Sequence, residues 1–271
     1  MFSFEFATAN RIIFGTGKLN ELGTYIEGNA KRLLLVCGHS SDAIHRVREI
    51  LSVLSISFIE FQVHGEPTVD VIRAGIKAAG NCDIVIGLGG GSVLDAGKAI
   101  AALVNNPGDV FDYLEVIGKG QPLVKAPLPY IAIPTTAGTG SEVTRNSVIE
   151  SPEQNVKVSL RSPLMLPHVA LVDPELTYRL PPEITASAGL DALTQLIEPF
   201  VSVKANPMTA RHVKNLDTCV CFLDTSTPKG PNFRTNSVSP SVGSPLRSVT
   251  VRLIVFVKDR ILDFLSVPVR L

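Results

Sequence analysis

A run of three glycines between an apolar segment and a helix-like segment constrains this chain more than any other feature. Residues 83–98 read DIVIGLGGGSVLDAGK, so a buried strand is expected before the glycines and a helix after them. Glycines let a backbone approach a ligand closely, and the N-terminus of the next helix offers unpaired N–H groups and partial positive charge. We therefore expect a phosphate cradle, with a ligand-free tight turn as the alternative. Its candidate cofactor-binding residues are Gly89, Gly90, Gly91, Ser92 and, on the helix, Asp95.

Apolar runs alternate with helical patterns along the first 134 residues. The alternation predicts an α/β fold, a doubly wound parallel sheet with crossover helices, which binds ligands at the carboxyl ends of its strands. The expected strands are 32–37, 55–63, 83–88 and 130–134, and the expected helices are 42–54, 69–80 and 92–104.

A second loop, residues 133–144 (IPTTAGTGSEVT), follows the last of these strands. Its hydroxyl groups and two glycines could donate hydrogen bonds to a ribose or a phosphate, and an ordinary Ser/Thr turn is the alternative. The candidate residues are Thr135, Thr136 and Thr139.

The residues after the strand 32–37 bear on cofactor choice. Gly38, His39, Ser40 and Ser41 precede the first carboxylate, Asp42, whereas an acidic side chain in such a place normally bonds the ribose 2′-OH and repels a 2′-phosphate. Nothing in these residues would repel a ribose 2′-phosphate. A simple helix N-cap is the alternative.

A third segment, residues 181–209, predicts a helix that carries two polar candidates on one face. Asp191 and Gln195 stand four residues apart, and a carboxylate on a largely apolar helix is costly unless it is paired or bound to a cation. Both residues are candidate metal ligands, and an ordinary capping or paired carboxylate is the alternative.

Composition excludes several classes of function. Basic and acidic side chains balance at 25 each, which argues against nucleic-acid or anionic-membrane partners, and no apolar run approaches the roughly 20 residues of a membrane helix. Four cysteines without a zinc-like CxxC pair indicate a reducing compartment, and the N-terminus lacks the basic start of a secretory signal. We expect a cytoplasmic protein.

The last 60 residues differ from the rest of the chain. They contain neither alanine nor glutamate, whereas the first 211 residues contain 20 and 13, and residues 226–247 have a loop composition. We therefore expect residues 212–271 to form a largely irregular tail that is unrelated to the rest of the chain.

Together, GGGSVLDAGK, IPTTAGTGSEVT, VDPELTYRLPPE and AGLDALTQLIEPFVS resemble, in order and spacing, the motifs of the iron-containing (type III) alcohol dehydrogenases. The resemblance covers about residues 4–210. It implies a dinucleotide-binding α/β domain at 1–178, followed by a helical domain that is incomplete here, at 179–211. It also implies NAD(P) as cofactor and a catalytic iron or zinc. It further implies that Gly89–Ser92 hold the pyrophosphate, that Thr135, Thr136 and Thr139 line the nicotinamide and its ribose, that Lys157 reaches a ribose, and that Asp191 binds the metal. Because no carboxylate stands between Cys37 and Asp42, we expect NADP(H) to bind at least as well as NAD(H).

The sequence departs from the family pattern at the metal. The family has a histidine four residues after the aspartate and two more downstream, whereas this chain has Gln195 and, beyond Asp191, only His212. We therefore expect a C-terminally truncated family member and carry two hypotheses. One is hydride transfer between a small alcohol or aldehyde and nicotinamide, with a homo-oligomer in view. The other is an inactive dinucleotide-binding remnant.

Overall fold

The computed structural model describes residues 3–26, 30–38, 42–203, 205–207, 248–257 and 260–270. Its chain divides into two compact units, Ser3–Leu180 and Pro181–Leu271, so the division falls two residues beyond the boundary expected at 178. Of the helices described, none has the length and apolarity needed to cross a membrane.

A six-stranded sheet forms the centre of the first unit, and every neighbouring pair of strands in it is parallel. Its order is β1-β8-β5-β4-β2-β3, which confirms the predicted doubly wound α/β class. The strands are β1 (Arg11–Phe14), β2 (Arg32–Cys37), β3 (Ser57–Gln62), β4 (Ile84–Gly89), β5 (Tyr130–Pro134) and β8 (Val169–Val172).

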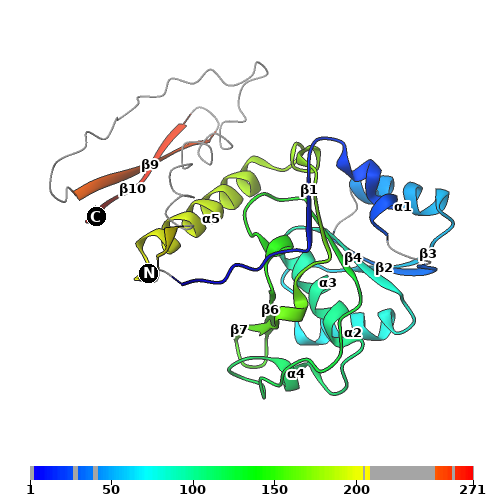
Figure 1. Ribbon diagram of the computed structural model, residues 1–271. Coiled ribbons are helices and arrows are strands. Elements are labelled where there is room, and N and C mark those ends of the chain that lie inside the picture. The colour runs from blue at the N-terminus through cyan, green and yellow to red at the C-terminus, as the bar shows by residue number, and fades with distance from the viewer. Residues whose placement is uncertain are drawn as a thin grey trace. The chain divides into compact units, whose positions relative to one another are not determined.

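Helices cover both faces of this sheet because its inner strands are apolar on both sides. In β2, Leu33 and Leu35 pack into one core while Leu34 and Val36 pack into the other. Figure 1 shows α1 on one side and α2 with α3 on the other. The first core contains η1 (Lys18–Tyr25) and α1 (Asp42–Val53), and the second contains α2 (Val69–Ala79), α3 (Gly91–Leu103) and α4 (Val110–Tyr113).

A β-hairpin and three short 3-10 turns complete the first unit. The hairpin strands β6 and β7 are antiparallel and lie outside the main sheet. These elements are η2 (Ser141–Val143), β6 (Asn146–Ser151), β7 (Val156–Arg161), η3 (Pro163–Met165) and η4 (Pro174–Thr177).

The second unit begins with the expected helix, α5 (Pro182–Val201), and has an antiparallel pair, β9 (Ser248–Val257) and β10 (Arg260–Arg270). The stretch 208–247 lies outside the described residues, so most of the predicted irregular tail stays a prediction.

The order of strands places the candidate site. From β2 the chain goes outward to β3 and then returns to β4 on the other side of β2. The strands stay parallel, but the direction in which successive strands are added changes between β2 and β4, and we call this point the sheet reversal. Ligands of such sheets bind at the carboxyl ends of the strands at this reversal. Cys37 at the end of β2 pairs with Leu88, and Gly89 at the end of β4 pairs with Pro134 of β5. All three candidate segments of the first unit therefore start at the same edge of the sheet.

Candidate functional site

The glycine turn joins β4 directly to α3. Gly89 is the last residue of β4, Gly90 is the N-cap of α3, and Gly91 is the first residue of the helix. No described side chain caps this helix, and its first turn carries no acidic residue. Its first-turn N–H groups, which no described side chain caps, and its positive dipole end therefore lie directly after the carboxyl end of β4, where they suit an anion.

The three glycines have different reasons to lack a side chain. A Cβ on Gly89 would lie 2.7 Å from Val93, and one on Gly91 would lie 2.7 Å from Thr139, so protein packing excludes both. A Cβ on Gly90 would lie 3.5 Å from its nearest neighbour, Thr136, which is ordinary contact. The backbone of Gly90 is extended, with φ −74° and ψ −176°, which any residue adopts. Neither backbone conformation nor packing demands a glycine at position 90, whereas packing does demand one at positions 89 and 91.

The threonine-rich loop lies against this turn. The N–H of Thr135 donates to the carbonyl of Gly89 at 2.9 Å, which joins the ends of β5 and β4. Thr136 is half-buried beside Gly90, and Thr139 is exposed beside Gly91. Gly38, just after β2, lies 3.5 Å from Val93 of α3, measured from an added Cβ. The structure thus brings together all the predicted cofactor residues of these three loops.

Asp95 lies in the second turn of α3, and both of its carboxylate oxygens have partners in the protein. One accepts a hydrogen bond from the Ser141 hydroxyl and the other from the Val148 N–H at 2.9 Å. Burial raises the pKa of this carboxyl, and Lys98 and these hydrogen bonds oppose the rise. Asp95 therefore ties α3 to the loop that follows the threonines.

Lys98 is the main residue that sequence reasoning missed. Its side chain is 1% exposed, and its ammonium group donates to the carbonyls of Ser141 at 2.6 Å and of Asn146 at 2.7 Å. Burial lowers the pKa of Lys98 to about 8, against the opposing effects of Asp95 and Glu142. One signal could have found it: Lys98 follows Asp95 by three residues on a helix whose remaining positions, AIAAL, are apolar.

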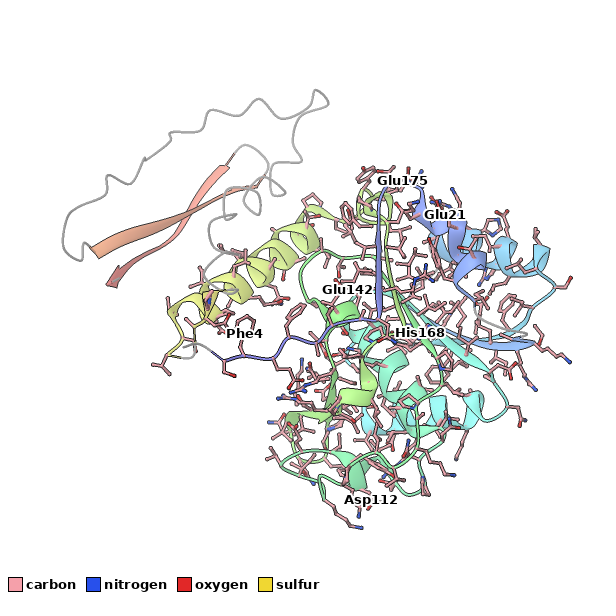
Figure 2. All side chains as sticks on the ribbon, in the orientation of Figure 1. Phe4, Glu21, Asp112, Glu142, His168 and Glu175 are labelled. Carbon is pink, nitrogen blue, oxygen red and sulfur yellow. The ribbon has the colours of Figure 1, made fainter. Side chains whose placement is uncertain are left out.

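Glu142 belongs to the same buried cluster. Figure 2 shows it on the loop beside α3, where burial raises the pKa of its carboxyl and the charge of Lys98 opposes this.

Lys157 lies on the β6–β7 hairpin rather than on the loops that follow β2, β4 and β5. Its ammonium group pairs with Glu66 at 3.2 Å, and about half of its side chain is exposed. Glu66 in turn lies close enough to Asp95 to raise the pKa of that carboxyl. The predicted contact of Lys157 with a ribose stays a prediction.

Asp191 and Gln195 both lie on α5, four residues apart and exposed. Together they offer one carboxylate and one amide. In the part of the chain that the structure describes, no group of three or more His, Cys, Asp or Glu side chains could hold a metal ion. Because a catalytic zinc site has three protein ligands, these residues do not make a complete metal site by themselves.

Comparison with known proteins gives consistent matches. The pattern described as iron-containing alcohol dehydrogenase matches residues 9–174. Alcohol dehydrogenase 4 of Saccharomyces cerevisiae is 38% identical over 212 residues, which are 75% of this chain and 54% of the yeast protein. The chain spans about half the length of the curated relatives it matches.

Solved structures match the described fold as well. An iron-containing alcohol dehydrogenase from Thermotoga maritima has a TM-score of 0.71 and 34% identity, covering 80% of this chain and 61% of its own. Sulfoacetaldehyde reductase from Bifidobacterium kashiwanohense, solved in complex with NAD+, has a TM-score of 0.71 and 31% identity, covering 82% and 57%.

Proposed function

Because the chain belongs to the iron-containing alcohol dehydrogenase family, we propose that it is an NAD(P)-linked oxidoreductase that transfers hydride between a small alcohol or aldehyde and nicotinamide. Its first unit binds the dinucleotide. The observation that carries this proposal is a glycine that neither packing nor backbone conformation requires: a Cβ added to Gly90, directly after β4, would make only ordinary contact with Thr136 at 3.5 Å.

The chain's own residues have separate tasks in this proposal. The N–H groups at the start of α3 hold the pyrophosphate, because they are uncapped donors at the positive end of a helix. Thr135, Thr136 and Thr139 line the nicotinamide and its ribose, and Lys157 reaches a ribose. Positioning of the nicotinamide ring against the substrate carbon is what a protein contributes to hydride transfer.

A metal is expected with the family, and iron or zinc are the candidates. Asp191 and Gln195 are the residues on α5 that would contribute to its binding. Two donors, one of them a neutral amide, are fewer than such a site needs, and no step of the reaction is derived through the metal.

We also propose that NADP(H) binds at least as well as NAD(H). The residue that directly follows β2 is Gly38, which has no side chain to repel a 2′-phosphate, and this supports the proposal. His39, Ser40 and Ser41 lie outside the described residues. Calorimetric titration with both cofactors tests it, and NAD binding at least tenfold tighter than NADP binding would overturn it.

A cytoplasmic, homo-oligomeric protein fits this function. Cys37 and Cys82 are buried free thiols, and burial raises the pKa of Cys37 to about 11, so this thiol is inert at neutral pH. The edge strand β1 exposes Ile12 and Phe14, which favours association. Sedimentation of the purified protein tests the oligomeric state.

The test of the proposed function is a two-part assay on the full chain. We expect saturable NADH binding and reduction of NAD(P)+ by a short alcohol, assayed with and without added Fe²⁺ or Zn²⁺. An Asp191→Ala variant should keep the binding, because Asp191 lies on α5 and outside the unit that holds the glycine turn. NADH binding with no alcohol-dependent reduction at any metal concentration would select the inactive remnant instead.

A further inference from the structure

We propose that Lys98 is a positioning residue for the dinucleotide site: its buried ammonium group holds the 141–146 segment, and through it Thr139, against the glycine turn. The inference rests on the proposed function because it concerns dinucleotide affinity.

The ammonium group donates hydrogen bonds to both ends of the segment. Ser141 begins the segment and Asn146 closes it, and the Lys98 Nζ donates to both backbone carbonyls, at 2.6 and 2.7 Å. The hydroxyls of Ser141 and Thr144 lie at 3.1 and 3.3 Å from the same nitrogen. Four oxygen atoms surround one ammonium group, so no other single side chain of the helix could replace it.

A short chain of contacts leads from these hydrogen bonds to the glycine turn. The N–H of Ser141 donates to the Thr139 hydroxyl at 3.3 Å. Thr139 in turn packs on Gly91, so closely that a Cβ at Gly91 would meet it at 2.7 Å. Lys98 therefore acts through Ser141 and Thr139 on the start of α3, where the pyrophosphate is proposed to bind.

The charge of Lys98 also balances two buried carboxylates. Asp95 of α3 lies 3.7 Å from its Nζ, and Glu142 of η2 acts on it electrostatically. Tyr130 of β5 also faces this cluster, but its hydroxyl donates to the Leu94 carbonyl and burial raises its pKa well above the usual value. His168, near β8, shares with the Lys98 stem a cavity of about 250 Å³.

The pKa of Lys98 decides the pH at which its role is tested. Because burial lowers the pKa of Lys98 to about 8, the buried site disfavours the ammonium form relative to water, and a rise in pH is not expected to release the 141–146 segment. The ammonium form and its contacts are therefore tested at about pH 7.

The first measurement needs no ligand. Hydrogen exchange of residues 135–146 is compared in the full-length wild type, in Lys98→Met, and in Lys77→Met, a matched change at an exposed position of α2. We expect exchange about tenfold faster in Lys98→Met only. Equal exchange in all three proteins would overturn the inference, whether or not the chain binds a dinucleotide.

The second measurement is the dissociation constant of NADH at about pH 7 in the same three proteins. We expect about tenfold weaker binding in Lys98→Met and wild-type binding in Lys77→Met. Thr144→Val removes one of the four oxygen atoms around the ammonium group and should speed exchange and weaken binding in the same direction. Unchanged exchange and affinity in a folded Thr144→Val would overturn the inference even if Lys98→Met fails to fold. Wild type that binds no NADH would overturn the proposed function instead, and the exchange measurement would still decide the role of Lys98.

Discussion

At the scale of single residues, the glycines in and around this site differ in whether packing requires them. Gly87 in β4 and Gly97 in α3 leave space for the buried ring of Tyr130, whose hydroxyl would lie 2.2 Å from a Cβ at Gly87. Gly90 has no such neighbour, since its added Cβ meets only Thr136, at 3.5 Å. Packing therefore explains Gly87 and Gly97. It does not explain Gly90, where we propose that the pyrophosphate approaches the backbone.

This difference predicts a cost for Gly87→Ala. The added methyl must displace the buried Tyr130, which should lower the free energy of unfolding by about 1–3 kcal/mol, as overpacking does. Gly80→Ala is the matched control: Gly80 is in the right-handed helical region, and its Cβ would lie 3.5 Å from the nearest atom, so a gain of about 0.4–1 kcal/mol is expected. Urea denaturation measures both. Equal stability of Gly87→Ala and wild type would contradict the packing account.

A pH dependence of stability follows from Lys98. Its pKa is about 8 in the folded protein and 10.5 ordinarily, chiefly because of burial. Below about pH 8, Lys98 is protonated in both the folded and the unfolded protein. Between about pH 8 and pH 10.5 it is protonated only in the unfolded protein, so the contribution of Lys98 to the free energy of unfolding rises with pH in this range. The stability difference between wild type and Lys98→Met should shift toward the wild type from pH 7.5 to 9.5, measured by urea denaturation at each pH. A constant difference would contradict this.

At the scale of elements, one buried carboxylate joins the two ends of the first unit. Asp173, just after β8, is 1% exposed and accepts hydrogen bonds from the N–H groups of Gly17 at 3.1 Å and Leu19 at 3.0 Å. It also accepts one from Glu175 at 3.1 Å. It thereby fixes the start of η1 to the end of a strand more than 150 residues later.

Asp173→Ala should be costly because it leaves these N–H groups without an acceptor. We expect a loss of about 3 kcal/mol or more in the free energy of unfolding. Asp70→Ala removes an exposed carboxylate that pairs with Arg73 and should cost less than about 1 kcal/mol. Chemical denaturation compares the two, and similar costs would show that Asp173 does not hold η1.

The geometry of α5 predicts a gain of metal binding. Asp191 and Gln195 lie on one helical face, and Gln195→His would convert the pair into a carboxylate and an imidazole. We expect Zn²⁺ affinity to rise at least about tenfold by calorimetry. Gln154→His, on an exposed turn of the other unit, is the control. Equal Zn²⁺ binding in both variants would argue against a metal site on this face.

Sequence patterns predicted most of the inner elements within a residue or two. The apolar run at 32–37 predicted β2, because a strand that is buried on both faces is apolar throughout. The periodic stretch at 42–54 predicted α1, because a helix that is buried along one stripe has apolar residues at helical spacing. The strands β1 and β8 were not predicted, because each has only four residues and so shows little periodicity. They pair with each other although they come from opposite ends of the first unit. The strands of the β6–β7 hairpin have six residues each and were also missed, because polar residues dominate a segment such as NSVIES and leave no clear apolar pattern.

In the candidate site, too, some residues could be predicted from the sequence and others could not. Loops after strands could be predicted as ligand-binding because glycine and threonine cluster there, and the sheet reversal does bring Gly38, Gly89 and Thr135 together. The role of Lys98 could not be predicted, because its acceptors lie 43 to 48 residues away in a loop whose path depends on the fold.

At the scale of the whole molecule, family membership and topology give the same account of the first unit. Residues 9–174 match the family pattern, and the described sheet reverses direction where the glycine turn lies. The chain spans about half the length of its curated relatives, so this unit and its dinucleotide site carry most of what can be tested. The central claim is that Gly90 marks the pyrophosphate position.

Calorimetric titration of NADH into wild type and Gly90→Val tests that claim most directly. The extended backbone at Gly90 accepts a valine, and its Cβ meets no atom closer than 3.5 Å, so the variant should fold with a melting temperature near that of the wild type. Its branched side chain would occupy the space proposed for the pyrophosphate. The account predicts saturable binding in the wild type and none in a folded Gly90→Val. Equal affinity in the two proteins would contradict it.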